Sequence, residues 1–214
     1  MRRPIEKYGL ILGEGRDDCV VFKKIAQAAG LSGLEFEELG GKDKFVQRLT
    51  QLSLSPEFTR GQINRILITR DADGSWEAAL HSLSDAVARV FGHAITKTRE
   101  WVSVNEHCEI ALWIVPGDDQ SGMLETLCLQ AAKEATPSDF ECLDQFAACL
   151  KQQTDAPLHE KEKFAIWSLV AQEKQLPRQR LSLPRAVVNI PLNWQDPLFS
   201  DLTELMSEAS MRHS

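Results

Sequence analysis

The stretch ILITRDADGSW, residues 66–76, joins an apolar run directly to two aspartates. The run INRILIT (63–69) is typical of a buried strand, because it is short, apolar and rich in β-branched side chains. Asp71 and Asp73 follow with one alanine between them. Two carboxylates this close repel each other unless water, a basic partner or a metal ion compensates their charge. We therefore expect a polar site where this strand ends.

Apolar runs and amphipathic segments alternate through the first 135 residues. Strands are predicted at 8–14, 34–39, 63–69 and 110–116, and helices between 16 and 30, at 42–52, at 75–91 and at 122–135. This order predicts an α/β fold with a mostly parallel sheet flanked by helices on both faces. In such sheets, ligands bind outside the carboxyl ends of the strands.

The pattern changes after residue 135. Helices are predicted at 138–152, 160–174 and 197–209, with a short extended piece at 184–194. We therefore expect an α/β core at 1–135 and a mainly helical C-terminal extension at 136–214. No low-complexity linker separates the two, so the extension is expected to pack on the core as part of one compact unit.

Composition narrows the class of protein. The 214 residues are 43% hydrophobic and 26% charged, with a net charge of −7, which argues against a uniformly basic nucleic-acid coat. No apolar run of about 18 residues predicts a membrane span. The arginines near the start precede no apolar segment of the signal-peptide kind. Five cysteines without a CxxC pair indicate reduced thiols, so we expect a cytoplasmic protein with no membrane partner.

Acidic side chains recur where predicted strands end. Glu14 closes the first strand, Asp18 follows four residues later, and Glu125 lies in the first turn of the helix after the fourth strand. If Asp71 and Asp73 remain extended, both point to the same side. Each feature has a simpler interpretation, because aspartates are common in turns and acids are favoured at helix starts. Together the five carboxylates predict a site for Mg²⁺ or Mn²⁺, since hard cations bind carboxylate oxygens.

Two of these motifs resemble a known family. LILGEGRDD (10–18), followed by a helix and later by ILITRDAD (66–73), resembles the Toprim domain of topoisomerases, bacterial primases, OLD-family nucleases and ribosomal-RNA maturases. The family pattern Glu-Gly-x-x-Asp matches Glu14, Gly15 and Asp18, and its later Asp-x-Asp matches Asp71 and Asp73. The resemblance covers residues 7 to about 130.

Three further segments resemble a branch of stand-alone, Toprim-like prokaryotic proteins related to OLD-family nucleases. They are GGKDKF (40–45), WIVPGDDQSGMLE (113–125) and HEKEKFAIWSLVAQ (159–172). In that branch the third acid begins a helix, which matches Glu125. OLD-family nucleases also use a basic residue C-terminal to the acids, and Lys163, or else Lys161, is the candidate for it here.

The resemblance implies phosphoryl transfer on nucleic acid that depends on a divalent metal. The metal ligands it implies are Glu14, Asp18, Asp71, Asp73 and Glu125, with Mg²⁺ or Mn²⁺ as the cofactor. Glu14 is implied as a general acid or base, and Lys163 as the residue that neutralises charge on the phosphate. Five carboxylates suit two ions about 3.5–4 Å apart. A nuclease that uses water as the nucleophile is the simplest such enzyme, with nucleic acid or a nucleotide as its partner.

Four residues are weaker candidates for phosphate binding. Gly40, Gly41 and Lys42 do not form a P-loop, so they either let backbone approach a phosphate or make a tight turn. His159 either binds phosphate or caps the helix that follows it. Lys163 has a simpler interpretation too, as a solvated helix lysine.

The position of the tyrosine argues against a topoisomerase. The chain's one tyrosine, Tyr8, begins the strand that Glu14 ends, so it is badly placed to be a topoisomerase nucleophile.

The alternative to a nuclease is a non-catalytic, Toprim-like module that holds metal and nucleotide. Such a module would act with a protein partner as an accessory or defence component.

Overall fold

A computed structural model describes residues 8–41, 44–154, 156–173 and 192–211. Its centre is one five-stranded sheet with the order β2-β1-β3-β5-β4. The strands are β1 (Tyr8–Gly13), β2 (Leu34–Glu38), β3 (Ile63–Asp71), β4 (Val102–Ser103) and β5 (Glu109–Val115). All neighbouring pairs are parallel except β4–β5. The mostly parallel α/β sheet is therefore confirmed.

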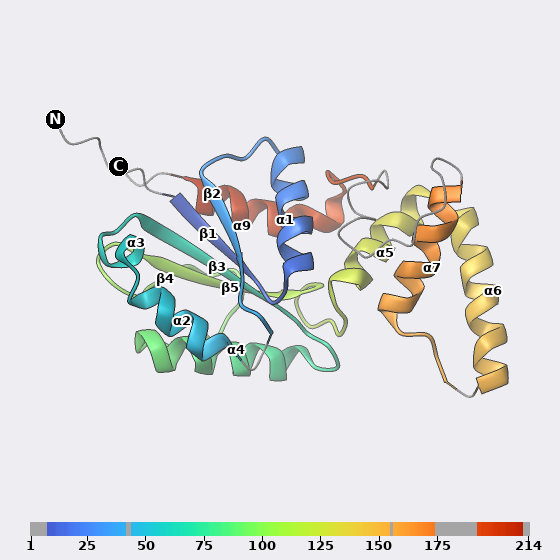
Figure 1. The fold of residues 1–214 in the computed structure, drawn as a ribbon, viewed down its shortest axis with the longest axis horizontal. Helices are drawn as coiled ribbons and strands as arrows, with labels where there is room; N and C mark the ends of the chain where they lie inside the picture. Colours follow the sequence, from blue (N-terminus) through green and yellow to red (C-terminus); the bar gives the residue numbers. More distant parts are fainter. Residues whose placement is uncertain (1–7, 42–43, 155, 174–191, 212–214) are drawn as a thin grey trace.

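Helices cover both faces of this sheet (Figure 1). They are α1 (Arg16–Ala28), α2 (Phe45–Ser53), α3 (Pro56–Thr59), α4 (Trp76–Phe91), α5 (Leu124–Ala135), α6 (Pro137–Thr154), α7 (Glu160–Glu173), the 3₁₀ turn η2 (Pro197–Phe199) and α9 (Ser200–Ser210). Helices α1 and α9 lie on one face, and α2 and α4 on the other (Figure 1). Among the described residues, no helix combines the length and apolar character needed to cross a membrane.

Alternation along the strands divides the buried side chains into two cores. Ile11 and Leu67 belong to the core beneath α1, α5 and α9, whereas Leu12 and Ile68 belong to the core beneath α2 and α4. Successive side chains of a strand point to opposite faces. The same alternation therefore decides which face the residues at the carboxyl ends of these strands occupy.

The described helices after residue 135 pack on two parts of the core. Helix α9 packs on β1, β2, β3 and α1, while α6 and α7 pack on α5 and on each other. Gly9 makes the close approach of α9 feasible, because a Cβ there would collide with the carbonyl oxygen of Ala209. The extended piece expected at 184–194 falls largely outside the described residues, which resume at Leu192.

Candidate metal centre

Three adjacent parallel strands end at the same edge of the sheet. Glu14 directly follows β1, Asp71 is the last residue of β3, and Glu125 lies in the first turn of α5, which follows β5. Asp18 lies in the first turn of α1. We call Glu14, Asp18, Asp71 and Glu125 the carboxylate cluster. The charges of Glu14 and Glu125 raise the pKa values of both Asp18 and Asp71.

Asp71 joins β3 to α5. Its Oδ1 accepts a hydrogen bond of 3.0 Å from the backbone N–H of Leu124, one of the amides that has no partner within its own helix. Burial, followed by the charges of Asp18, Glu125 and Glu14, raises the pKa of Asp71 to about 8 against the lowering effect of the bond from Leu124. The carboxylate is therefore held at a helix start but is short of positive charge.

Asp18 reaches back over the start of α1. Its Oδ2 accepts a 2.9 Å hydrogen bond from the backbone N–H of Gly15, and Gly13 leaves the space that the Asp18 side chain occupies. Burial raises the pKa of Asp18 to about 6, opposed by the bond from Gly15 and reinforced by Glu14 and Glu125. The residue thus serves as a helix cap and as part of the cluster.

Glu125 is the most deeply buried of the four, with 7% of its surface exposed. Burial raises its pKa, Lys161 lowers it, and Asp17 and Glu160 raise it. A buried acid with few compensating charges favours its neutral form unless a cation arrives. Glu125 therefore needs positive charge in the same way as Asp71.

Arg70 is a residue of this site that the sequence interpretation missed. Its Nε lies 4.0 Å from Glu14 Oε2, and its guanidinium carbon lies 5.9 Å from the centre of the Phe45 ring. The signal was present in the sequence, because Arg70 immediately precedes Asp71. It was not recognised because an arginine at a strand end is more often solvated than directed at a neighbouring acid.

Asp73 does not follow the extended path that the sequence interpretation assumed. It has a φ of +50°, it is exposed, and its backbone forms an isolated bridge with Gly122. The condition under which Asp71 and Asp73 would point to the same side, a chain that stays extended, is therefore not met. Its charge is not among those that raise the pKa of Asp71 or of Asp18.

The two candidate lysines have different surroundings. Lys163 Nζ lies 2.7 Å from Glu160 Oε1, one helical turn away on α7. Lys161 is exposed, and its charge favours the ionised form of Glu125. The structure thus relates Lys161, the less favoured candidate, to the carboxylate cluster more directly than Lys163.

The candidate phosphate-binding residues are occupied by local contacts. His159 is exposed, and its backbone N–H donates to Glu162 at the start of α7, as expected of a helix cap. Gly40 and Gly41 both have positive φ, and the Gly41 N–H donates to the carbonyl of Glu14 at 3.0 Å. This turn therefore borders the cluster, but the Gly41 amide already has an acceptor. Lys42 lies outside the described residues.

The donor set of the cluster suits a hard divalent cation, although the side chains do not converge on one. In the part of the chain that the structure describes, no group of three or more His, Cys, Asp or Glu has the arrangement of a metal site. Two of the four carboxylates are held by other hydrogen bonds, because Asp18 accepts the Gly15 N–H and Asp71 accepts the Leu124 N–H. Glu14 Oε2 is buried with no hydrogen-bond partner among the described residues. Binding a cation requires these side chains to rotate toward one another.

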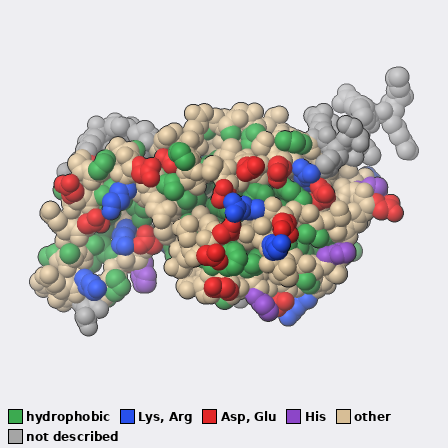
Figure 2. Space-filling view, turned by 180° about the vertical axis from the view of Figure 1, so that it is seen from behind, with side chains coloured by type: hydrophobic (Ala, Val, Ile, Leu, Met, Phe, Trp, Pro, Cys, Tyr) green, Lys and Arg blue, Asp and Glu red, His purple; other side chains and the backbone are tan. Residues whose placement is uncertain are grey.

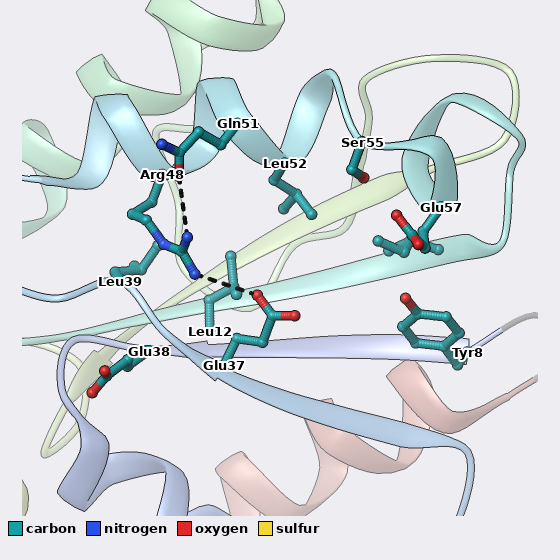
Figure 3. A pocket seen from close by; sticks show the side chains of 11 residues that line it. Tyr8, Leu12, Glu37, Glu38, Leu39, Arg48, Gln51, Leu52, Ser55 and Glu57 are labelled. Carbon is teal, nitrogen blue, oxygen red and sulfur yellow. Dashed lines mark hydrogen bonds and ion pairs between the residues drawn. The ribbon is translucent and has the colours of Figure 1, made fainter.

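A cavity of about 340 Å³ lies away from the cluster, between β2 and the α2–α3 region (Figure 3). Figure 3 shows Arg48 over this cavity, with its guanidinium 3.7 Å from Glu37 and bonded at 3.1 Å to Gln51. None of the predicted metal ligands lines it. On the face seen in Figure 2, acidic and basic side chains are interspersed, and the described residues form no broad basic surface there.

The fold and the site define an α/β protein with carboxylates gathered at the carboxyl edge of its sheet. The chain belongs to the family described as "Protein of unknown function (DUF3226)", whose family model matches residues 8–209. No curated protein matches the chain.

Two solved structures are similar to this chain in fold. One is the C-terminal region of the Burkholderia pseudomallei OLD protein, at 13% identity and a TM-score of 0.50, covering 95% of this chain and 98% of that one. The other is the C-terminal region of the Xanthomonas campestris pv. campestris OLD protein, at 13% identity and a TM-score of 0.48. The match covers 95% of this chain and 94% of that one.

Proposed function

We propose that this protein is a divalent-metal-dependent nuclease that hydrolyses phosphodiester bonds at the carboxylate cluster. The observation that carries the proposal is the gathering of four carboxylates at one sheet edge, where burial and the neighbouring negative charges raise the pKa of Asp71 to about 8. Buried like charges are costly, and a bound cation is the usual compensation in protein sites. The resemblance of both sequence motifs to Toprim domains supports the same chemistry.

Each residue has a role in this proposal that follows from its position. Glu14, Asp18, Asp71 and Glu125 would hold Mg²⁺ or Mn²⁺, with Asp73 as a further candidate ligand outside the cluster. When bound, the cation supplies charge stabilisation and activation of water for attack on the phosphodiester. Glu14 has a buried oxygen without a partner among the described residues, which suits a group that exchanges a proton.

A basic side chain near the acids completes the proposed site. The charge of Lys161 acts on Glu125, so this residue is favoured over Lys163 as the group that neutralises charge on the reacting phosphate. Lys163 is engaged by Glu160 on its own helix.

The direct test is cleavage of labelled single- and double-stranded DNA and RNA by the full-length protein with Mg²⁺ or Mn²⁺. We expect cleavage that a chelator abolishes and that Asp71→Asn lowers by about 100-fold or more. Asp144→Asn is the matched control, because it also removes one carboxylate but lies on α6 beside Lys133. Cleavage that persists unchanged in Asp71→Asn would contradict the proposal.

A second candidate is a non-catalytic module that binds metal and nucleotide beside a protein partner. The net charge of −7 and the interspersed charges in Figure 2 favour it, because they offer a long polyanion little attraction. Metal-dependent binding of a nucleotide without turnover in the same assay would support this candidate over the nuclease.

A further inference from the structure

Arg70 and Asp71 are consecutive, so the sheet places them on opposite faces. Asp71 bonds Leu124 on the α5 side, whereas Arg70 stacks over Phe45 of α2, which belongs to the other core. Glu14 reaches Arg70 from the neighbouring strand β1. The site therefore has a cationic side beneath α2 as well as an acidic side beneath α1 and α5.

Two nitrogen atoms of the Arg70 guanidinium have no hydrogen-bond acceptor among the described residues. The Arg70 side chain is 11% exposed, and its Nε and Nη1 are buried with no partner among the described residues. Glu14 Oε2, at 4.0 Å, is too distant for a hydrogen bond and is itself buried without a partner. Buried N–H groups of a charged side chain are costly to leave unbonded, so this pair is suited to receive a further group.

We propose that Arg70 binds a non-bridging oxygen of the substrate phosphate, next to the cation-binding carboxylates. The inference rests on the proposed function and adds the residue that recognises the anion. A planar guanidinium presents paired donors that match phosphate, and a charged partner strengthens such bonds. Stacking on Phe45 restrains the group, so less side-chain freedom is lost when phosphate binds.

The lysines near the site carry charge but no planar pair of donors, so they do not replace Arg70 in this role. Lys163 already donates to Glu160 at 2.7 Å, and Lys161 is exposed. A simpler role for Arg70 is a permanent countercharge for Glu14. The two roles differ in one measurable respect: a phosphate ligand controls anion affinity, whereas a structural countercharge controls the stability of the fold.

The test measures two affinities of the full-length protein in Arg70→Gln and Arg70→Lys. Mn²⁺ binding is measured by calorimetry without nucleic acid. Binding of a fluorescent single-stranded oligonucleotide is measured by anisotropy with Ca²⁺, after a gel has established that the oligonucleotide stays intact. Arg48→Gln is the matched control, because it removes the same charge from an arginine that contacts Glu37 and Gln51 over a separate cavity.

We expect Arg70→Gln to weaken oligonucleotide binding by about tenfold or more, the usual effect of losing a charged hydrogen-bonding partner. Its Mn²⁺ affinity should stay equal or rise, because a positive charge 4.0 Å from Glu14 has been removed. Arg70→Lys should recover part of the oligonucleotide affinity, since it restores the charge without the paired donors. Arg48→Gln should change neither affinity by more than about twofold.

Two outcomes overturn the inference while leaving the nuclease proposal intact. One is an oligonucleotide affinity in Arg70→Gln equal to that of the wild type. The other is a parallel fall of both affinities and of the melting temperature in both Arg70 variants, which marks a structural countercharge. A wild-type protein that neither binds nor cleaves nucleic acid with any divalent cation contradicts the proposed function itself, and the inference fails with it.

Discussion

The carboxylate of Asp71 accepts the backbone N–H of Leu124 at 3.0 Å, so the last residue of β3 also caps α5. This relationship separates the structural role of Asp71 from its charge. An asparagine oxygen accepts the same hydrogen bond without the negative charge. Asp71→Asn therefore preserves the helix cap while removing one of the repelling carboxylates.

The first prediction concerns the thermal stability of Asp71→Asn. Without divalent cation at about pH 8, its melting temperature should equal or exceed that of the wild type, because a buried repulsive charge is gone. Mg²⁺ should raise the melting temperature of the wild type but not that of the variant, since a ligand stabilises only the state that binds it. Scanning fluorimetry measures both. If Asp71→Asn and Asp144→Asn show the same rise with Mg²⁺, Asp71 is not a ligand.

The second prediction concerns pH in the presence of a chelator. The pKa of Asp71 is about 8 in the folded protein and 3.8 for an ordinary aspartate, as in the unfolded chain, so between these values the folded state holds a proton that the unfolded state has lost. The free energy of unfolding should therefore fall as pH rises through this window. Asp18, with a pKa of about 6, contributes in the same direction over the lower part of the window.

Urea unfolding at several pH values isolates this effect when wild type is compared with Asp71→Asn. The stability advantage of the variant should grow from about pH 4 to about pH 8 and then level off. A difference that does not change with pH would mean that Asp71 is ionised throughout.

The third prediction distinguishes the two lysines of α7. Lys161→Ala should lower the rate of nucleic-acid cleavage by about tenfold or more, as expected for loss of a group that stabilises charge on phosphate. Lys163→Ala should have a smaller effect, because the Lys163 amine is already held by Glu160. The two cleavage rates are compared at the same Mn²⁺ concentration. A larger loss of rate in Lys163→Ala would contradict the prediction and favour Lys163, as the sequence did.

The fourth prediction tests whether the C-terminal helix belongs to the core. Gly9→Ala introduces a Cβ that collides with the Ala209 carbonyl, so α9 must move away from β1. We expect a loss of about 1–3 kcal/mol in the free energy of unfolding, typical of overpacking. Gly74→Ala is the control, because a Cβ at Gly74 meets no atom within 4 Å. Equal unfolding free energies for the two variants would mean that α9 is not held closely on the sheet.

Much of the fold followed from hydrophobic periodicity. The runs that became β1, β3 and β5 are short and apolar, and each is followed by a helix, a pattern that favours parallel strands. Adjacent parallel strands end at one edge, so the proximity of Glu14 and Asp71 was predictable. The two-residue strand β4 was not, because two residues have no detectable period.

The details of the site depended on conformations that residue spacing does not reveal. Asp73 leaves the path of β3 because its φ is +50° and its backbone pairs with Gly122. Arg70 reaches Glu14 because β1 and β3 are neighbouring parallel strands that end at the same edge of the sheet. Both features arise from pairing between segments far apart in the sequence, which a local pattern does not encode.

The central claim is that the carboxylate cluster binds a divalent cation. Its most direct test is calorimetric titration of Mn²⁺ into the full-length protein at about pH 8, above the pKa of Asp18 and near that of Asp71, with Glu125→Gln measured beside it. We expect saturable binding to the wild type and an affinity at least about tenfold lower in the variant, since loss of one carboxylate ligand removes a substantial part of the site. No binding to the wild type, or equal affinity in the two proteins, would contradict this claim.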